Sequence, residues 1–435
     1  MEKQLYAVTG NPVLHSLSPV LMNYAAKNQG LNFRYLRLTA LSAEEALRSF
    51  KQLNLKGLNV TAPFKQDVIK YLDFLTPNAQ KAGAVNCIYY SSDKKLCGDN
   101  TDITGVELSL KQYPEYLKQG KLLVIGSGGA VPAVVIAGQN LGLEVTIAAR
   151  NQEKLSVLKE NFNVICTDLN GIENWVNNYE IIVQALPSGV KVFEPSVLNK
   201  KHVVLDANYK DSIFEESSKK IGFKFLSGKN WLVNQAVPAF ENFTSQSTSD
   251  KIMYKALDEK PFVFSQRIAL SGFMGVGKTT SGRQLAALTG YKFIDSDDEI
   301  EKETGKKISQ IFAEKGEEYF RQLETEFLKT LSKETKIILS CGGGTVKTEE
   351  NRKILREKFL NLWLYAPVEY CLDGLDVSNR PLLQCDNPLE KAREMFLGRV
   401  SNYADAAFAI VNVENLNRNQ IAEKIYGQIS KTFKI

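Results

Sequence analysis

A glycine-rich loop that ends in lysine and threonine stands at residues 272–280. It follows the spacing G-x-x-x-x-G-K-T between a strand-like apolar run and a helix-like run. Glycines let consecutive backbone N–H groups converge on phosphate oxygens at a helix N-terminus, where the helix dipole favours an anion. Lys278 can reach the β- and γ-phosphates, and the Thr279 hydroxyl can bind Mg²⁺. The complete motif argues against a chance turn and predicts a nucleoside triphosphate site at Gly272, Gly275, Gly277, Lys278, Thr279 and Thr280.

Two aspartates and an arginine–glutamate pair downstream could serve a phosphoryl acceptor. Asp295 and Asp297 lie two apart at the end of a predicted strand, so we expect both side chains on the same face of that strand. One carboxylate can hold Mg²⁺ through water while the other contacts an acceptor hydroxyl. Arg321 and Glu324 lie three apart on a predicted helix and share a face, where the carboxylate can orient the guanidinium.

Further residues of this half could complete the site. Gly342, Gly343 and Gly344 follow a predicted strand directly and let a ligand approach the backbone closely. Arg380 follows a polar stretch with the character of a lid, and Arg399 lies on a predicted helix. Each charged residue, taken singly, is more often a solvated surface group, so it is their combination that indicates a site.

A second glycine-rich turn, in KLLVIGSGGA at 121–130, lies between a predicted strand and a predicted helix, as in dinucleotide-binding folds. An NAD site usually carries Asp or Glu about 20 residues later, where it accepts hydrogen bonds from the ribose. This chain has Arg150 there and Lys154 one turn further on, and a cation can pair with a 2′-phosphate. The pattern favours NADP(H), with a surface arginine as the alternative. The predicted cofactor residues are Gly126, Gly128, Gly129, Ala130, Arg150 and Lys154.

Polar motifs crowd the start of the chain: GNPVLHSLSP, NVTAPFK, GAVN and GDNTD. Serine, threonine and asparagine clusters usually form turns and helix caps, so each motif alone says little about function. Lys65 and Asp102 carry charge within these motifs, but they lie 37 residues apart and spacing cannot bring them together.

The elements that must position these residues alternate between strand-like and helix-like runs, which predicts parallel βαβ units. The alternation restarts near residue 120 and again with a strand-like run at 267–272. In the first series, helix-like stretches stand at 18–29, 43–53 and 64–75.

Composition narrows the class of protein. A chain of 435 residues has room for two or three domains, and 44% hydrophobic with 24% charged residues excludes a disordered, collagen-like or coiled-coil protein. A net charge of +5 is too small for a nucleic-acid or membrane-surface binder. Six cysteines without a CxxC pair, two histidines, no signal-like start and no long apolar run indicate a cytoplasmic protein without a zinc site.

The polar motifs, together with GKNWLVNQAVPAFENF, resemble shikimate dehydrogenase over about residues 3–245. The resemblance implies that Lys65 and Asp102 form a catalytic dyad for the reduction of 3-dehydroshikimate by NADPH. Lys65 would donate a proton or hydrogen bond to the developing alkoxide, and Asp102 would orient Lys65 and a substrate hydroxyl. The residues that the resemblance assigns to the substrate are Ser16, Ser18, Thr61, Asn86, Asp102, Tyr209 and Gln235.

Four residues depart from the pattern of that family. Met22 replaces the usual histidine, and Gln184 and Leu186 stand where the family has asparagine and threonine. Trp231 stands where a methionine commonly flanks the nicotinamide. The last three residues belong to the cofactor side of the predicted site.

The second half, at roughly 266–435, is similar to shikimate kinase, because G-x-x-G-x-G-K-T, D-x-D, F-R-x-x-E, GGG and R-P-L appear in order. The resemblance implies ATP-dependent phosphorylation of the shikimate 3-hydroxyl. Asp297 would position that hydroxyl, while Lys278 and Arg380 would stabilise charge on the migrating phosphoryl group. The residues assigned to shikimate are Asp297, Arg321, Glu324, Gly343, Gly344 and Arg399, and those assigned to Mg²⁺ are Thr279 and Asp295.

These patterns predict an α/β chain. The expected parts are an α/β substrate domain at 1–104 and 229–245, a Rossmann-like NADP domain at 105–228, a polar linker at 246–265 and a P-loop kinase domain with a helix-flanked parallel sheet at 266–435.

The predicted function is a bifunctional enzyme that reduces 3-dehydroshikimate and then phosphorylates shikimate. Two alternatives stay open. One is a metabolite-sensing regulatory pseudoenzyme, against which the retained lysines and carboxylates argue. The other is a quinate/shikimate dehydrogenase that uses NAD, against which Arg150 argues. The sequence makes no prediction of the oligomeric state.

Overall fold

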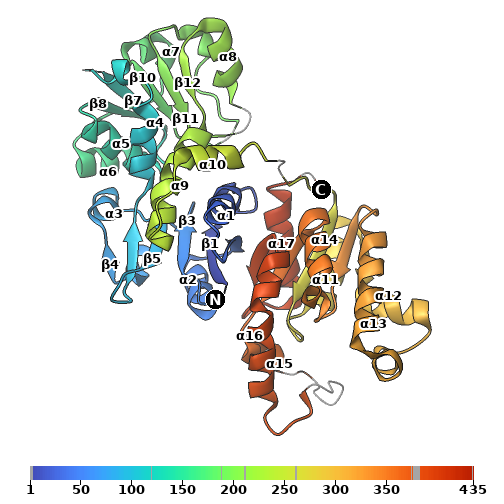
Figure 1. The fold of residues 1–435 in the computed structure, drawn as a ribbon. Coiled ribbons are helices and arrows are strands. Elements are labelled where there is room, and N and C mark those ends of the chain that lie inside the picture. The colour runs from blue at the N-terminus through green and yellow to red at the C-terminus, as the bar shows by residue number, and fades with distance from the viewer. Residues whose placement is uncertain are drawn as a thin grey trace. The chain divides into compact units, whose positions relative to one another are not determined.

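A computed structural model describes residues 3–118, 120–187, 189–209, 212–259, 262–373, 375, 383–433 and 435. The chain forms two compact units (Figure 1). The first comprises Met1–Pro19, Gly30–Leu55 and Lys260–Ile435, and the second comprises Val20–Gln29 and Lys56–Glu259. These units group the first strands of the chain with its P-loop half. The domain boundaries expected from the sequence stay a prediction.

Among the described residues, the first unit holds a parallel sheet of seven strands in the order β14-β15-β13-β16-β17-β2-β1. Parallel strands are covered on both faces and need nearly continuous apolar runs, and LNLWLY in β16 is buried at every position. The strands are β1 Gln4–Gly10, β2 Phe33–Thr39, β13 Arg267–Gly272, β14 Lys292–Asp295, β15 Ile337–Ser340, β16 Leu360–Tyr365 and β17 Ala409–Asn412.

Helices follow the strands of this sheet. Helix α11 begins after Gly277 and ends before Gly290, and both glycines adopt the left-handed conformation. Helix α13 is kinked at Gly316, where φ is 82°. The helices are α2 Ala43–Gln52, α11 Lys278–Thr289, α12 Ser296–Thr304, α13 Ile308–Leu331, α14 Glu349–Lys358, α15 Val368–Leu372, α16 Pro388–Ala406 and α17 Arg418–Ser430, with the 3₁₀ turn η5 Thr345–Lys347.

A seam within this unit joins residues 30–55 to the P-loop half. Strands β2 and β17 pair in parallel, with Arg37 opposite Ala409. Beside them, the ammonium of Lys424 in α17 pairs with the carboxylate of Glu45 in α2 and donates a 2.9 Å hydrogen bond to the carbonyl of Asn412. The Lys424 side chain is only 1% exposed, so Glu45 supplies the counter-charge that its burial requires.

The second unit contains two groups of strands. Four short strands, in the order β3-β5-β6-β4, are mixed in direction, and six parallel strands follow the order β12-β11-β10-β7-β8-β9. The strands are β3 Gly57–Val60, β4 Phe74–Leu75, β5 Cys87–Tyr90, β6 Leu96–Asp99, β7 Lys121–Ile125, β8 Glu144–Ala148, β9 Ile165–Thr167, β10 Ile181–Gln184, β11 Val203–Asp206 and β12 Lys224–Leu226.

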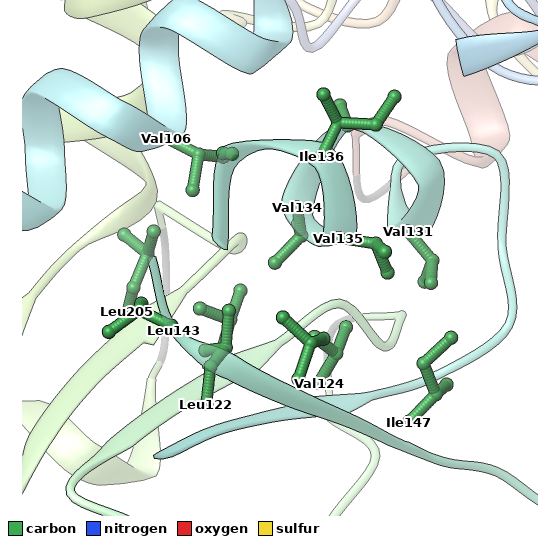
Figure 2. Close-up of a cluster of buried hydrophobic side chains, with 14 of the residues drawn as sticks. Val106, Leu122, Val124, Val131, Val134, Val135, Ile136, Leu143, Ile147 and Leu205 are labelled. Carbon is green, nitrogen blue, oxygen red and sulfur yellow. The ribbon is translucent and has the colours of Figure 1, made fainter. Parts of the chain in front are cut away.

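Alternate residues of β7 enter different hydrophobic clusters. Leu122 and Val124 pack against helix α5 (Val131–Asn140), as Figure 2 shows, and Leu123 and Ile125 belong to a separate cluster that includes Phe214 of α8 (Ile213–Ile221). Because successive side chains of a strand point to opposite faces, this division places packed helices on both sides of the six-stranded sheet.

The remaining helices belong to this unit, apart from the first residues of α1. They are α1 Ser18–Asn28, α3 Pro77–Ala82, α4 Asp102–Leu110, α5 Val131–Asn140, α6 Gln152–Phe162, α7 Ile172–Trp175, α8 Ile213–Ile221, α9 Gly228–Thr244 and α10 Asp250–Ala256. The 3₁₀ turns are η1 Ile69–Tyr71, η2 Pro114–Tyr116, η3 Val176–Asn178 and η4 Pro195–Val197. Within the described part of the chain, no helix has the length and apolar character needed to cross a membrane.

The α/β class and its helix-flanked parallel sheets are confirmed, as are helices in 18–29 and 43–53. The predicted helix at 64–75 is wrong, because this stretch holds turns, η1 and β4. The backbone of this stretch forms hydrogen bonds with residues that lie further along the sequence. The Lys65 carbonyl accepts from Val85 N at 2.8 Å, and Asp73 N donates to Leu96 O at 3.0 Å. These tertiary hydrogen bonds override the local helical pattern. The predicted linker also contains a helix, α10.

The buried ion pair at the seam gives a prediction about stability. Glu45→Ala leaves the Lys424 ammonium buried without its carboxylate, so we expect the free energy of unfolding of the first unit to fall by about 3 kcal/mol. Urea denaturation followed by hydrogen exchange in peptides that cover 409–430 measures this loss. Glu44→Ala is the matched control, because Glu44 is the exposed neighbour on the same helix. Equal stability of the two variants contradicts a structural role for the pair.

Candidate functional site

The predicted phosphate-binding loop connects β13 to α11. Gly275 adopts a φ of +77°, and a Cβ atom there would lie 1.9 Å from the carbonyl oxygen of Cys371, so the position requires glycine. Among the described residues, no side chain caps the N-terminus of α11, which leaves its first N–H groups available to an anion. The Lys278 ammonium donates to the carbonyls of Gly272 and Phe273, each at 3.0 Å. Burial lowers the pKa of Lys278.

The residues predicted to hold Mg²⁺ lie together. The Thr279 hydroxyl donates to Asp295 Oδ2 at 2.8 Å and lies 3.2 Å from the hydroxyl of Ser340, at the end of β15. Among the described residues, no three His, Cys, Asp or Glu side chains form a metal-binding group. A magnesium ion beside Thr279 and Asp295 would therefore depend on water and nucleotide phosphates for its other ligands, which suits Mg²⁺.

The prediction that Asp295 and Asp297 share a strand face is wrong. Asp295 ends β14 and caps α12, where its Oδ1 accepts from the backbone N–H of Asp297 at 3.1 Å. Asp297 lies in the first turn of the helix, because the strand ends before the second aspartate is reached.

Asp297 lies among charged groups that change its proton affinity. Burial, followed by the nearby carboxylates of Asp295 and Glu324, raises the pKa of Asp297 to about 6, against the opposing charges of Lys278 and Arg321. A Cβ atom on Gly342 would lie 2.5 Å from Asp297 Oδ1, so the glycine run after β15 makes room for this carboxylate. A carboxyl group with this pKa can accept a proton near neutral pH.

Arg321 is held by two carboxylates of its own helix. It pairs with Glu324, and its Nη2 lies 2.8 Å from Glu317 Oε1. Glu317 also accepts from Lys347 at 2.7 Å, and these hydrogen bonds lower the pKa of Glu317 to about 2. A Cβ atom on Gly344 would lie 2.3 Å from Arg321 Nη2, so glycine is needed beside this guanidinium.

A cavity of about 1,640 Å³ joins these groups, and several lining residues are the predicted nucleotide and acceptor residues. Arg399 Nη1 and the Tyr403 hydroxyl donate to the carbonyl of Gly343 at 3.3 and 3.1 Å. Arg380, predicted for the lid, lies outside the described residues. The predicted residues that line the cavity are Gly275, Gly277, Lys278, Thr279, Thr280, Asp295, Asp297, Arg321, Gly343, Gly344 and Arg399.

In the second unit, Lys65 and Asp102 lie in direct contact. Lys65 Nζ is 2.6 Å from Asp102 Oδ2, and both side chains are largely buried. Lys65 follows β3 and Asp102 is the first residue of α4, so tertiary structure closes the gap that spacing could not bridge. A lysine paired with a carboxylate in a sheltered place can donate a proton to a reacting oxygen.

A buried amide network lies next to this pair in the chain, because its member Thr101 directly precedes Asp102. Asn86 Nδ2 donates to the Thr101 hydroxyl at 3.0 Å, and the backbone N–H of Thr101 donates to Asn86 Oδ1 at 2.8 Å. Asn86 Nδ2 also lies 3.4 Å from Gln235 Oε1, in α9. The structure thus brings two of the predicted substrate residues, Asn86 and Gln235, into one network.

The other predicted substrate residues do not all lie in one unit. Thr61 and Tyr209 lie partly exposed in the second unit. Ser16 and Ser18 belong to the first unit, where their hydroxyls are 3.3 Å apart and Arg37 donates to the Ser16 carbonyl at 2.8 Å. Their assignment to the substrate stays a prediction.

The second glycine turn connects β7 to α5. Gly126 has a φ of +128°, and a Cβ atom there would meet the carbonyl oxygen of Ala185 at 2.8 Å. Gly128 and Gly129 have open space around them, and no side chain caps α5, which begins after Ala130. An open helix N-terminus beside a close glycine turn fits a pyrophosphate.

The cations predicted to select the cofactor follow β8. Arg150 is exposed, and Lys154 lies in the first turn of α6, where its N–H is capped by Asn151 at 2.8 Å. Within the described residues, neither side chain has an ion-pair partner. Both charges therefore face solvent, where a phosphate can reach them.

Sequence reasoning missed several contacts of these sites. Glu317 pairs with both Arg321 and Lys347, Ser340 contacts Thr279, and Thr101 joins Asn86. Glu317 had a usable signal, because it lies four residues before Arg321 on the same helix. The others come from separate elements and carried no signal.

Comparison with known proteins matches two separate stretches of the chain to two different families. Residues 8–88 match the family model for the shikimate dehydrogenase substrate-binding domain, and residues 274–430 match the model for shikimate kinase. A relative from Aquifex aeolicus, shikimate dehydrogenase (NADP(+)), is 36% identical over 247 residues, which span 55% of this chain and 91% of the relative.

Solved structures give the same result for the dehydrogenase part. Shikimate dehydrogenase from Aquifex aeolicus is 33% identical with a TM-score of 0.56 and covers 59% of this chain and 98% of its own. Shikimate 5-dehydrogenase from Thermus thermophilus, in complex with NADP(H) and shikimate, is 28% identical with a TM-score of 0.54 over the same shares. The chain therefore belongs to the shikimate dehydrogenase family and carries a shikimate kinase domain fused after it.

Proposed function

We propose that the chain reduces 3-dehydroshikimate to shikimate at Lys65 and Asp102, and phosphorylates the 3-hydroxyl of shikimate at the cavity beside Lys278. The observation that carries the first activity is the 2.6 Å contact of Lys65 with Asp102 beside a buried amide network. The reductive direction is supported by the fusion itself, because the product of reduction is the acceptor that the kinase domain consumes.

The dehydrogenase residues divide the work of the reduction. When bound, NADPH supplies a hydride to the carbonyl carbon of the substrate. The Lys65 ammonium donates a proton to the carbonyl oxygen as it becomes an alkoxide, and Asp102 holds Lys65 in position. The amides of Asn86 and Gln235 offer hydrogen bonds to the hydroxyl groups of the substrate.

NADP(H) is the proposed cofactor. Open glycines at Gly128 and Gly129 fit a pyrophosphate, and the solvent-facing Arg150 fits a 2′-phosphate. The Thermus relative contains NADP(H), which supports the same cofactor here.

The kinase residues position two anions and one hydroxyl. Lys278 and the N-terminus of α11 bind the phosphates of ATP, and Thr279 and Asp295 would hold Mg²⁺, which neutralises phosphate charge. Asp297 accepts the proton of the attacking hydroxyl as the phosphoryl group passes from ATP to that oxygen and ADP leaves. Arg321 and Arg399 bind the carboxylate of shikimate, while Arg380 remains a proposal from sequence alone.

We further propose a cytoplasmic location, since all six cysteines are free. The regulatory alternative is disfavoured because each site keeps its charged groups in contact, and the NAD alternative is disfavoured by Arg150.

The two activities are separable by mutation. Lys65→Ala removes the proton donor, so we expect the turnover rate of the NADPH-dependent reduction to fall at least about a hundredfold while shikimate phosphorylation continues. Lys278→Ala has the reverse effect. Lys70→Ala, an exposed lysine near Lys65, is the control that keeps both activities. Loss of both activities in either single variant contradicts two independent sites.

The raised pKa of Asp297 predicts the acid limb of phosphorylation. Asp297 must be ionised to accept a proton, so kcat/KM for shikimate falls about tenfold for each pH unit below about 6. Asp297→Asn lowers the rate and removes this limb from the pH profile. Asp298→Asn, at the exposed neighbour, keeps it. An unchanged acid limb in Asp297→Asn shows that another group titrates.

Cofactor selection depends on Arg150 in this proposal. Arg150→Ala removes the partner of the 2′-phosphate, so we expect the KM for NADPH to rise about tenfold with little change for NADH. Lys159→Ala, at an exposed position of the same helix region, controls for a general loss of positive charge. The role of Arg150 in cofactor selection is contradicted if the variant keeps the wild-type ratio of kcat/KM for NADPH to kcat/KM for NADH.

A further inference from the structure

Trp231 occupies a place in the second unit that the mechanism above does not use. It lies in α9, is 6% exposed, and its indole N–H donates to Asp102 Oδ1 at 3.2 Å. The other oxygen of Asp102 is taken by Lys65. Both oxygens of the Asp102 carboxylate therefore have a side-chain partner.

The packing of α4 against α9 fixes the orientation of this indole. Gly105 lies one turn after Asp102 in α4, and a Cβ atom there would stand 2.8 Å from Trp231 Cδ1 and 3.1 Å from its carbonyl oxygen. Trp231 also belongs to the hydrophobic cluster that contains Val106. In this packed position the N–H of the ring is directed at the Asp102 carboxylate.

We propose that Trp231 is a positioning residue of the dehydrogenase site. Its N–H holds Oδ1 of Asp102, which keeps Oδ2 on the Lys65 ammonium. A lysine side chain is long and flexible, so the direction in which its ammonium points depends on a fixed partner. A carboxylate that is held at both of its oxygens supplies such a fixed partner. The inference rests on the proposed Lys65–Asp102 dyad and assigns Trp231 no contact with the reacting atoms.

The test removes the N–H without changing the shape of the ring. In the full chain, Trp231 is replaced by 3-benzothienylalanine, in which sulfur stands in place of the N–H, and separately by phenylalanine. We expect both variants to lower the turnover rate of the dehydrogenase reaction roughly tenfold, the effect of one hydrogen bond to a charged group. We expect the KM for NADPH to stay within about twofold, because the change acts after binding. Phosphorylation of shikimate continues unchanged.

Trp175→Phe is the matched control, because Trp175 lies in the same unit and its N–H donates to the carbonyl of Asn170. This variant keeps the wild-type turnover rate. A benzothienyl variant that turns over as fast as the wild type overturns the proposal, even if Trp231→Phe is slow, because size and not the N–H then matters. An active Lys65→Ala enzyme instead overturns the dyad on which the inference rests.

A spectroscopic readout checks the contact independently of turnover. The chain has three tryptophans, so an ¹⁵N–¹H spectrum contains three indole signals, and Trp231→Phe identifies one. We expect that signal to move on addition of shikimate and in the Asp102→Asn variant, while the Trp175 signal stays in place. A Trp231 signal that ignores both changes overturns the hydrogen bond.

Discussion

A charge that leaves water must gain a partner, and both candidate sites follow from this constraint. Lys65 is largely buried against Asp102, and Arg321 is largely buried between two carboxylates of its own helix. The partners have to arrive from fixed directions, and two of the charged residues lie at the first position of a helix. Asp102 opens α4 and Lys278 opens α11. The rest of each unit, the helix-covered sheets above all, holds these ends in place.

Local sequence patterns were sufficient for the features that depend on local geometry. The α/β class, the two glycine loops and the helix that carries Arg321 with Glu324 follow from short spacings, because backbone conformation and helix periodicity are local properties. Family resemblance added the Lys65–Asp102 contact, which the structure contains. The grouping of the first strands with the P-loop half was not foreseen, since the pairing of β2 with β17 involves residues far apart in the chain.

The wrong predictions can each be traced to specific hydrogen bonds. The stretch 64–75 has a helical pattern, but hydrogen bonds from Val85 and to Leu96 hold its backbone in turns and a short strand. The spacing of the aspartate pair suits a strand, yet Asp295 ends the strand and caps the next helix, so Asp297 follows helical geometry. The hydrogen bond of Trp231 could not be predicted because its partner Asp102 lies 129 positions away. The first and the last of these cases depend on hydrogen bonds between residues that no short window of sequence contains.

The seam between β2 and β17 also sets an order of events during synthesis. Arg37 leaves the ribosome long before its partner Phe408, which follows 371 positions later. Translation at about 5–20 residues per second makes that interval roughly 20–70 s. Throughout this time the edge of β2 has no strand beside it from the chain's own C-terminal part, and exposed edges invite pairing with other chains. The nascent protein therefore passes through a stage in which this edge of β2 is unpaired, although β17 pairs with it in the finished fold. Chaperone contact with residues 33–39 at that stage would protect the chain from misassembly.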